Sequence, residues 1–424
     1  MTEQINVPKL RFGEFEAYWV KQALGERMTI FRGASPRPKG DPRYYGGSVP
    51  RLMIQDATRD GKYTTPRIDF LTEEGGERSR YLNAGSVVLS CSGTRVAIPT
   101  LLAVDACVHD GWLAFKDYKD IEPEYLYYLF VKLHERMQGS ATTGGVFNNL
   151  TTEIMNNLLM SFPTLPEQQK IASFLSKVDE KIALLTEKKD KLTEYKKGVM
   201  QQLFNGRWEE QQGELTFIPP TLRFKADDGT EFPDWEEKRI TEIAHTYIGL
   251  VTTMTAHYVE RDGVFLIRNS DIKQNKIKTE QLIQLSHNFA KEHKNRALQL
   301  NDIVTVHTGD IGVSSVITED LVGSQGFATL NTRLISDRIS AEYLCWYYNS
   351  FSNIKFAYSV ATGDGRSNYN LKDFNRAMIP IPEMAEQIKI ANFLSAIDQK
   401  IDLANSELEK AKEWKRGLLQ QMFV

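Results

Sequence analysis

Two stretches of this 424-residue chain combine arginine and lysine with aromatic, amide and glycine residues, which are the side chains that contact nucleic acids. Residues 27–67 contain nine basic and three acidic residues, and residues 261–296 contain eight basic and four acidic ones. Cations bind phosphates, and Arg, Asn and Gln read base edges through paired hydrogen bonds. Either stretch alone could be an ordinary solvated surface. Their recurrence at matching places of an internal repeat favours nucleic-acid contacts.

Two pairs of glycine-containing loops add further candidate contacts. Residues 91–95 and 307–312 form one pair, and residues 143–149 and 362–369 form the other. Their Arg, Asn, Ser and Thr side chains can bond bases and phosphates, although Gly-Gly and Gly-Asp are equally common in plain turns. From the basic stretches and these loops we predict the following DNA contacts: Arg32, Arg37, Lys39, Tyr44, Gln55, Arg95, Asn148, Arg268, Asn269, Lys273, His307, Arg366 and Asn368.

Candidate catalytic motifs are incomplete. Residues 41–44 (Asp-Pro-Arg-Tyr) are similar to the Asp-Pro-Pro-Tyr motif of amino-methyltransferases, but the third residue is arginine and no convincing loop for S-adenosylmethionine accompanies them. Residues 233–238 (Pro-Asp-Trp-Glu-Glu-Lys) contain the letters of a metal-dependent nuclease core, which requires separate strands. A phosphate-binding P-loop is missing, and the histidines and cysteines lack metal-ligand spacing. We therefore expect no catalytic residue, no metal site and no cofactor in this chain.

Composition limits the class of protein. The length fits two globular domains with connectors, and 41% hydrophobic and 25% charged residues are ordinary for a soluble chain. We find no secretory signal and no apolar segment long enough to span a membrane. Three scattered cysteines fit a reducing compartment, so we expect a cytoplasmic protein. The net charge of −3 argues against simple nonspecific coating of nucleic acid.

A long helix-forming segment occurs twice. Residues 167–204 and 386–423 align without a gap at a shift of 219, and 19 of the 38 positions are identical. Fainter matches, such as residues 82–88 with 298–304, extend the repeat into the regions between the helices. The chain is therefore a tandem duplication. We expect two domains and two helices with the boundaries 1–162, 163–206, 207–380 and 381–424.

Both segments carry the apolar heptad pattern of a coiled coil. At about 1.5 Å per residue each helix is roughly 55 Å long, and its best partner is the other copy in antiparallel orientation. Lysines at 189, 196 and 415 interrupt the pattern, so we expect loosened packing or snorkelling there. Gly198 and Gly417 indicate close approach of another backbone, a bend, or an accident kept by duplication. The predicted seam comprises Ile171, Leu175, Val178, Ile182, Leu185, Ile390, Leu394, Ile397, Ile401 and Leu408.

The remaining regions read as mixed α/β domains. Residues 87–89, 264–267 and 303–306 are predicted as buried strands, and residues 123–134 and 341–351 as amphipathic helices. The predicted fold class is α+β. It has two mixed α/β domains separated by two long antiparallel coiled-coil helices, with a pseudo-two-fold internal repeat.

This pattern resembles the DNA-specificity subunits of Type I restriction–modification systems. The resemblance is carried by residues 163–179, with Pro-x-x-Pro-Glu-Gln-x-Lys-Ile-Ala followed by Phe-Leu and Val-Asp, and by their echo at 381–398. Residues 54–56 and 267–271 agree more weakly. The second repeat has Met384-Ala385 in place of its second proline, which leaves the start of that helix open.

The resemblance implies that each domain is a target-recognition domain for one half of a bipartite DNA sequence. The helix pair would set the spacer and dock two modification subunits, which bind S-adenosylmethionine and methylate adenine. Restriction subunits, which depend on ATP and Mg, would join them, so all cofactors would belong to partners. The alternative is a dumbbell-shaped scaffold that joins two protein partners without touching DNA. The residues themselves leave both interpretations open.

Overall fold

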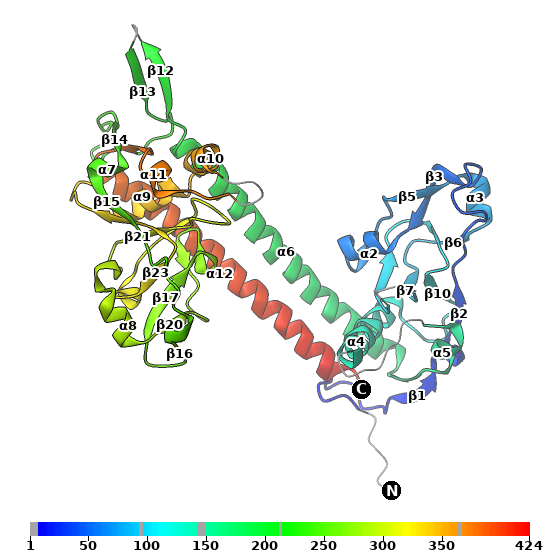
Figure 1. Cartoon of the computed structure of the whole chain (residues 1–424). Coiled ribbons are helices and arrows are strands. Elements are labelled where there is room, and N and C mark those ends of the chain that lie inside the picture. The colour runs from blue at the N-terminus through cyan, green and yellow to red at the C-terminus, as the bar shows by residue number, and fades with distance from the viewer. Residues whose placement is uncertain (1–6, 93–95, 142–149, 212–213, 363–366) are drawn as a thin grey trace. The chain divides into compact units, whose positions relative to one another are not determined.

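The computed structural model describes residues 7–92, 96–141, 150–211, 214–362 and 367–424, which fall into two compact units (Figure 1). The first unit comprises Met1–Thr186 with Ser406–Val424, and the second comprises Glu187–Asn405. Each unit contains the start of one long helix and the end of the other. The long helices are α6 (Leu165–Leu203) and α12 (Met384–Met422).

The first unit contains two mixed sheets and the helix α4. The five-stranded sheet has the order β2-β10-β7-β8-β4, the four-stranded sheet has the order β5-β3-β9-β6, and β1 pairs with β11. Strand β7 is fully buried because it lies inside its sheet and packs against α4. The bounds are β1 (Val20–Ala23), α1 (Leu24–Arg27), β2 (Thr29–Arg32), β3 (Tyr45–Leu52), α2 (Ile54–Asp60), β4 (Tyr63–Thr64), β5 (Asp69–Leu71), α3 (Glu73–Glu77), β6 (Arg80–Leu82), β7 (Val87–Ser90), β8 (Pro99–Leu102), β9 (Ala106–Val108), β10 (Trp112–Lys116), α4 (Pro123–Ala141), α5 (Thr152–Asn157) and β11 (Leu159–Phe162).

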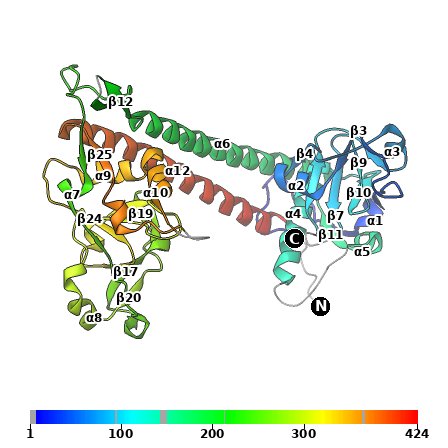
Figure 2. The ribbon, with the colours of Figure 1, turned by 45° about the horizontal axis from the view of Figure 1, so that its top comes forward.

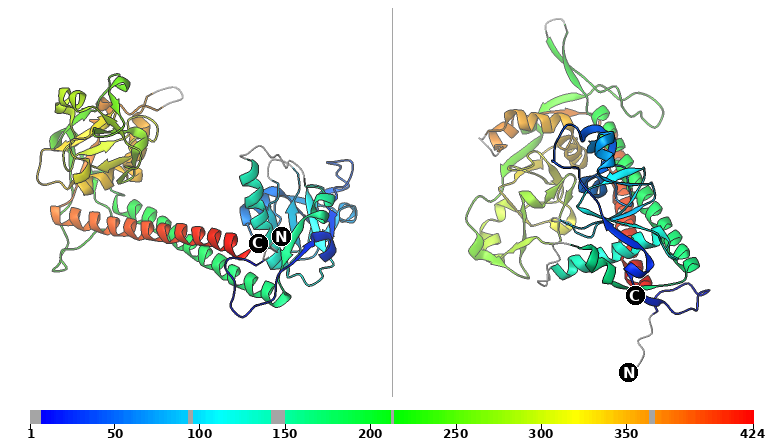
Figure 3. Two further views of the ribbon diagram at one scale, coloured as in Figure 1. Left: turned by 90° about the horizontal axis from the view of Figure 1, so that it is seen from below. Right: turned by 90° about the vertical axis from the view of Figure 1, so that its right-hand side faces the viewer.

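The second unit repeats this plan with two four-stranded sheets, ordered β15-β24-β21-β22 and β16-β20-β17-β23. Strand β14 pairs with β25 as β1 pairs with β11. The hairpin β12–β13 projects from the rest of this unit (Figures 1 and 3). The bounds are β12 (Arg207–Gln211), β13 (Glu214–Ile218), β14 (Glu236–Arg239), α7 (Ile240–Ile243), β15 (Ala244–Ile248), η1 (Thr255–His257), β16 (Tyr258–Val259), β17 (Val264–Arg268), η2 (Asn269–Asp271), β18 (Ile272–Lys273), β19 (Lys276–Ile277), β20 (Ile283–Leu285), α8 (His287–Glu292), η3 (Lys294–Arg296), β21 (Ile303–Thr305), β22 (Ser314–Val316), η4 (Glu319–Leu321), β23 (Gln325–Phe327), β24 (Leu330–Leu334), α9 (Ala341–Tyr348), α10 (Phe351–Val360), α11 (Leu371–Phe374) and β25 (Met378–Ile381).

The predicted fold class is confirmed. The predicted strands appear as β7, β17 and β21, although β21 ends one residue earlier than predicted. The predicted helix at 341–351 is wrong at its end, because α9 stops at Tyr348. Ser350 caps the next helix, α10, through its side chain, which accepts from the Asn353 N–H. A local hydrogen bond thus divides one apolar run into two helices.

The two long helices run antiparallel within each unit (Figures 1 and 2). In the first unit Ile171 and Leu175, near the start of α6, share one hydrophobic core with Leu418 and Met422 from the end of α12. The second unit mirrors this, since Ile390 and Leu394 pack with Val199 and Leu203. The other seam residues are Val178, Ile397 and Leu408, which are buried, and Ile182, Leu185 and Ile401, which are half-buried.

A Glu-Gln pair anchors α6 to the first domain. The Glu167 carboxylate is fully buried and accepts two hydrogen bonds from Arg11, each 2.7 Å long, and one from Trp19 Nε1 at 3.2 Å. Gln168 accepts from the Glu122 N–H at 3.0 Å and donates to the Asp120 and Pro163 carbonyls. A buried charge requires such complete pairing.

The same anchor fixes α12 to the second domain. Glu386 accepts from Arg223 and from Trp235 Nε1, the latter at 3.0 Å. Gln387 accepts from the Ser340 N–H at 2.9 Å and donates to the Arg338 and Pro382 carbonyls. The lost proline therefore leaves the anchor intact, and α12 begins at Met384. The Glu-Gln pair is identical in the two repeats because each copy makes the same contacts with its own domain.

Two of the seam lysines form ion pairs across the helix pair. Lys196 lies 2.5 Å from Asp398 and 4.8 Å from the centre of the Trp346 ring. Its counterpart Lys415 lies 2.6 Å from Asp179. Both lysines therefore make specific ion pairs between the two helices, which the prediction of loosened packing or snorkelling did not include. Lys189, by contrast, pairs only with its neighbour Asp190, at 3.5 Å, in the described structure.

The glycines Gly198 and Gly417 lie within continuous helix. A Cβ atom added at either would meet no described atom within 4 Å. Close approach by another backbone is therefore wrong within this chain. Both positions present open helix surface instead.

Candidate nucleic-acid interface

In the first unit three of the predicted basic residues, Arg32, Arg37 and Lys39, lie near one aspartate. Arg32 Nε donates to the Asp110 carbonyl at 2.5 Å, Ser35 Oγ donates to its carboxylate at 2.6 Å, and Arg37 Nη2 lies 3.5 Å from that carboxylate. Arg37 and Lys39 are exposed and close enough to add positive charge at this point. We call Arg32, Ser35, Arg37, Lys39 and Asp110 the Asp110 cluster. Its exposed cations can contact phosphate or base edges.

The backbone holds this cluster in place. Gly33 N–H donates to the Trp112 carbonyl and Ala34 N–H donates to the Val108 carbonyl, which joins the loop after β2 to the β9–β10 turn. A Cβ atom at Gly33 would lie 2.2 Å from the His109 carbonyl oxygen, so only glycine permits this approach. These backbone contacts therefore fix the position at which the loop with Arg37 and Lys39 begins.

Electrostatics favour a charged aspartate beside a neutral histidine. The hydrogen bond from Ser35 lowers the pKa of Asp110 below its usual value. Burial lowers the pKa of His109, and the nearby Arg51 guanidinium lowers it further. In agreement, His109 Nδ1 accepts a hydrogen bond from the Gly111 N–H at 2.9 Å. Asp110 thus orients the cluster as an anion, and His109 adds no charge to it at neutral pH.

Tyr44 is placed differently from the prediction. Its side chain is 3% exposed, so it offers no surface to DNA. The guanidinium groups of Arg43 and Arg78 lie 5.2 and 4.7 Å from its ring centre. Tyr44 therefore supports two arginines through cation–π contacts. A buried tyrosine in a basic stretch cannot be distinguished from an exposed one by sequence.

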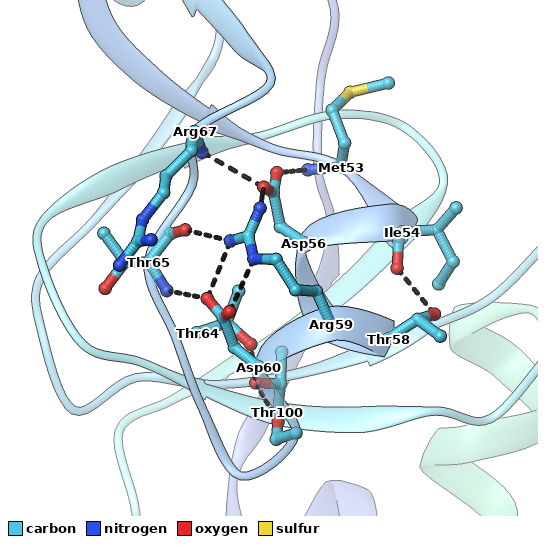
Figure 4. A network of polar contacts seen from close by, with 11 residues as sticks. Met53, Ile54, Asp56, Thr58, Arg59, Asp60, Thr64, Thr65, Arg67 and Thr100 are labelled. Carbon is cyan, nitrogen blue, oxygen red and sulfur yellow. Dashed lines mark hydrogen bonds and ion pairs between the residues drawn. The ribbon is translucent and has the colours of Figure 1, made fainter. Parts of the chain in front are cut away.

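Gln55 is exposed on α2. The next residue, Asp56, belongs to a polar network that includes Arg59, Asp60 and Arg67 (Figure 4). Asp56 is fully buried and accepts from the Met53 and Arg67 N–H groups and from Arg59 Nη1. Asp60 binds Arg59 through both carboxylate oxygens. The Arg59 guanidinium lowers the pKa of Asp60 to about 2. This network fixes the turn after β3 and leaves the exposed Gln55 amide available for contact.

The second unit builds the equivalent turn with Arg268. Asp271 accepts from the Arg268 N–H and from two atoms of its guanidinium, all at 2.9 Å. Asn269 accepts from the His307 N–H at 2.9 Å and donates to the Ala328 carbonyl. Arg268 and Asn269 are therefore already engaged within the fold. They shape this surface more than they extend from it.

The loops after β17 and β21 meet the segment before α11. His307 Nδ1 lies 2.9 Å from the Tyr369 carbonyl, and Thr308 Oγ1 donates to Asn368 Oδ1 at 2.9 Å. Asn269, His307 and Asn368 thus come together, while Lys273 is half-buried on β18. The second unit thus offers the imidazole of His307 and the amide of Asn368, whereas the first unit offers guanidinium and ammonium groups.

Three predicted contacts, Arg95, Asn148 and Arg366, lie outside the described residues. The sequence analysis missed Ser35 and Asp110, which orient the first cluster. The Asp110-Gly111 pair is a turn signal, but only the folded chain shows which arginines it binds. In the described residues we find no group of three or more His, Cys, Asp or Glu side chains arranged to hold a metal ion. Of the helices described, none combines the length and apolar character needed to cross a membrane.

Known proteins share both halves of this architecture. Residues 58–194 and 233–413 match the Type I restriction modification DNA specificity domain family. The chain is 24% identical over 400 residues to the type I restriction enzyme MjaVIII specificity subunit of Methanocaldococcus jannaschii, covering 90% of each protein. It is 22% identical to the EcoBI specificity subunit of Escherichia coli, covering 67% of this chain and 60% of that protein.

Two solved structures have the same fold. The S subunit of a type I restriction–modification system from M. genitalium superimposes with a TM-score of 0.56 at 14% identity, covering 99% of each chain. A chain from a type I system solved in a study of complex assembly gives a TM-score of 0.59 at 17% identity, covering 95% and 97%. Because the family match occurs twice and spans most of the sequence, the predicted resemblance is confirmed, and this chain belongs to the family of type I restriction–modification DNA specificity subunits.

Proposed function

We propose that each α/β domain of this chain reads one half of a bipartite DNA target and that the helix pair sets the spacer between the halves. In this role the chain is a noncatalytic, cytoplasmic subunit. It directs two modification subunits, and the restriction subunits that join them, to DNA. S-adenosylmethionine, ATP and Mg are assigned to those partners.

The observation that carries this proposal is the contrast between the anchors and the loops. The Glu167-Gln168 and Glu386-Gln387 anchors repeat the same contacts, although the two domains have diverged. The Asp110 cluster presents cations, whereas the second unit presents the imidazole of His307 and the amide of Asn368, with Asn269 holding the His307 backbone in place. Different donors and acceptors select different bases. Two domains that carry different base-contacting side chains and are held to the helices by the same contacts suit a bipartite target whose two halves differ in sequence.

The open glycines support docking of partners on the repeated helices. Gly198 and Gly417 occupy equivalent positions, and a Cβ atom at either would meet no described atom within 4 Å beyond the backbone of its own helix. Glycine in a helix interior costs about 1 kcal/mol, so its presence at both sites favours a partner that packs against bare backbone. Two equivalent surfaces suit two copies of one modification subunit.

The decisive experiment maps adenine methylation in a host genome with this gene present and then deleted, with the modification subunits retained. We expect methylation at one bipartite, asymmetric sequence only when the gene is present. A contiguous target, or methylation independent of this gene, would contradict the proposal.

The scaffold alternative requires a separate measurement. The complex with modification subunits is titrated with random-sequence DNA at 50 to 200 mM salt. A DNA-reading subunit should bind with an affinity that falls steeply as salt rises, because phosphate contacts release counterions. A scaffold should add nothing to the binding shown by the modification subunits alone.

A further inference from the structure

The first unit buries a lysine ammonium between α4 and α6. Lys62 Nζ donates to Glu124 Oε2 at 3.0 Å and to Tyr128 Oη at 3.1 Å, both on α4. It also donates to Ser176 Oγ on α6 at 3.0 Å, and the lysine side chain is 11% exposed. Because α4 belongs to the first domain, Lys62 ties that domain to a long helix at a point separate from the Glu167 anchor.

The polar network of Lys62 continues to the other long helix. Tyr128 Oη donates to Asp179 Oδ2 on α6 at 2.7 Å, and Asp179 Oδ1 lies 2.6 Å from Lys415 Nζ on α12. The Lys415 ammonium also lies 5.8 Å from the centre of the Tyr128 ring. Lys62, Tyr128, Asp179 and Lys415 thus connect the first domain to both helices. Such a network favours one geometry, because a shift that leaves a buried polar group unpaired is costly.

The second unit has a lysine at the equivalent place, but in a different environment. Strand β4 directly follows Lys62 and lies beside β8, and β19 begins with Lys276 and lies beside β22. Because β8 pairs with β7 as β22 pairs with the repeated strand β21, the two lysines are counterparts. Lys276 Nζ lies 3.7 Å from Asp402 on α12, with the two side chains 65% and 69% exposed. An ion pair between exposed groups contributes little and is screened by salt, so Lys276 ties its domain to α12 weakly.

A cavity of about 680 Å³ lies in the second unit where the Lys62 network lies in the first. Its lining includes Asn275 and Trp346 from the domain and Ser395 from α12, which holds the repeat position of the serine that Lys62 contacts. Trp346 stands in place of Tyr128 and donates to Ser395 Oγ at 3.3 Å. An indole N–H is a donor only, so Trp346 cannot accept from an ammonium group as a phenol does. The second domain therefore meets its long helix here beside unfilled space.

We propose that Lys62 is a positioning residue for target reading, which fixes the first domain on the helix pair and thereby contributes to the choice of spacer length, a task that Lys276 does not share. This inference rests on the proposed function, in which the helix pair sets the spacer. One base pair added to the spacer shifts a half-site by about 3.4 Å and about a tenth of a turn. A domain held by a buried polar network resists that shift, and without the network the domain follows it more easily.

The first experiment uses Lys62→Met, which keeps an unbranched apolar stem and removes the ammonium group. Glu124 keeps a hydrogen bond from Tyr63 Oη and Tyr128 keeps its bond to Asp179, so the variant should fold. The reconstituted complex is tested for methylation of DNA that carries both half-sites at the natural spacing and at one base pair more or less. We expect the preference for the natural spacing to fall about tenfold, because hydrogen bonds from a charged group are lost.

The internal repeat supplies the matched control. Lys276→Met removes the equivalent ammonium group and should leave the spacer preference unchanged. In both variants the preference for the bases of each half-site should stay as it is, because Lys62 acts on the placement of a domain and not on its reading loops. An unchanged spacer preference in Lys62→Met, or an equal loss in Lys276→Met, would overturn the proposal. Loss of base preference together with spacer preference would overturn it too, since Lys62 would then support the domain itself.

A second experiment measures the placement of the domains without DNA or partners. Spin labels on cysteines introduced at the exposed Glu73 and Glu180 report the distance from the first domain to α6, and labels at the exposed Lys291 and Gln399 report that from the second domain to α12. Pulsed electron resonance on the full chain should show that Lys62→Met broadens the first distance distribution and leaves the second unchanged. An unbroadened first distribution would overturn the proposal even where the complex methylates a bipartite target, which leaves the proposed function standing. A broadened one without any bipartite target would contradict the proposed function instead.

Discussion

The basic residues of this chain differ in how much of their positive charge is free to bind DNA. Arg59 and Arg268 are neutralised by aspartates that hold turns, whereas Arg37 has a 65% exposed side chain and only a 3.5 Å contact with Asp110. The count of basic residues in a stretch therefore overstates the charge available to DNA. Which arginine is free depends on a partner distant in sequence, as Asp110 is from Arg37.

A buried carboxyl group gives a testable pH dependence. Glu237 Oε2 is buried without a described partner and lines a cavity of about 340 Å³ with Trp235, Tyr347 and Arg376. Burial raises the pKa of Glu237 from 4.5 to about 7. A raised folded-state pKa contributes stability that is present below pH 4.5 and lost as pH rises through about 7.

We therefore expect Glu237→Gln, which mimics the protonated side chain, to leave the free energy of unfolding unchanged near pH 4.5. Above pH 7.5 it should raise that free energy by about 1–2 kcal/mol, a value that allows for partial screening by solvent. Urea titrations at both pH values measure the difference. Glu236→Gln, which alters the preceding exposed carboxyl, serves as the control. An equal effect at both pH values would show that titration of Glu237 is not the cause.

At the scale of elements, the sequence predicts what local pattern determines. Heptad spacing predicts α6 and α12, and buried apolar runs predict β7 and β17. The sequence does not predict the structural role of Glu167. A carboxylate at the start of a helix is usually exposed, whereas Glu167 is buried and pairs with Arg11, which lies 156 residues away in the sequence. The candidate site shows the same limit, because Tyr44 is hidden by neighbours that the pattern does not specify.

The lysines in the seam give a matched pair of variants. Lys196→Met leaves Asp398 without a described ion pair, whereas Lys415→Met leaves Asp179 with a hydrogen bond from Tyr128 Oη at 2.7 Å. We expect Lys196→Met to cost about 1–3 kcal/mol and Lys415→Met to cost less, because unsatisfied polar groups dominate the loss. Chemical denaturation of both variants checks this. The reverse order would mean that the Lys415 contacts carry more of the stability.

The helix glycines separate stability from assembly. Gly198→Ala should raise the free energy of unfolding of the isolated chain by about 0.5–1 kcal/mol, since alanine is the better helix former and the structure leaves room for its Cβ. The same change should weaken assembly with modification subunits about tenfold if a partner packs against the backbone there. Thermal unfolding and analytical ultracentrifugation measure the two effects. Gly417→Ala repeats the test, and unchanged assembly in both variants would favour an accident of duplication.

At the scale of the whole molecule, duplication explains both the similarity and the divergence of the two units. Each unit keeps the residues that hold a helix to a domain, such as Trp19 and Trp235, and varies those on its loops. The anchors must match because they join the same helix to the same kind of domain. The loops of the Asp110 cluster and of His307 are free to differ because none of the anchor hydrogen bonds involves them. Two readers of different specificity can therefore evolve on one unchanged frame.

This modularity predicts independent half-sites. Arg37→Ala in the first unit should weaken DNA binding by about 1–3 kcal/mol where that residue contacts a base and relax one position of one half-site. If Arg37 contacts a phosphate instead, affinity should fall for all sequences and the salt slope should decrease by about one. Lys273→Ala in the second unit should affect only the other half-site, and the double variant should be additive. Binding of the reconstituted complex to a library of bipartite DNA measures all three variants. Relaxed reading of both half-sites by Arg37→Ala alone would show that the domains do not read independently, because that change is confined to one domain.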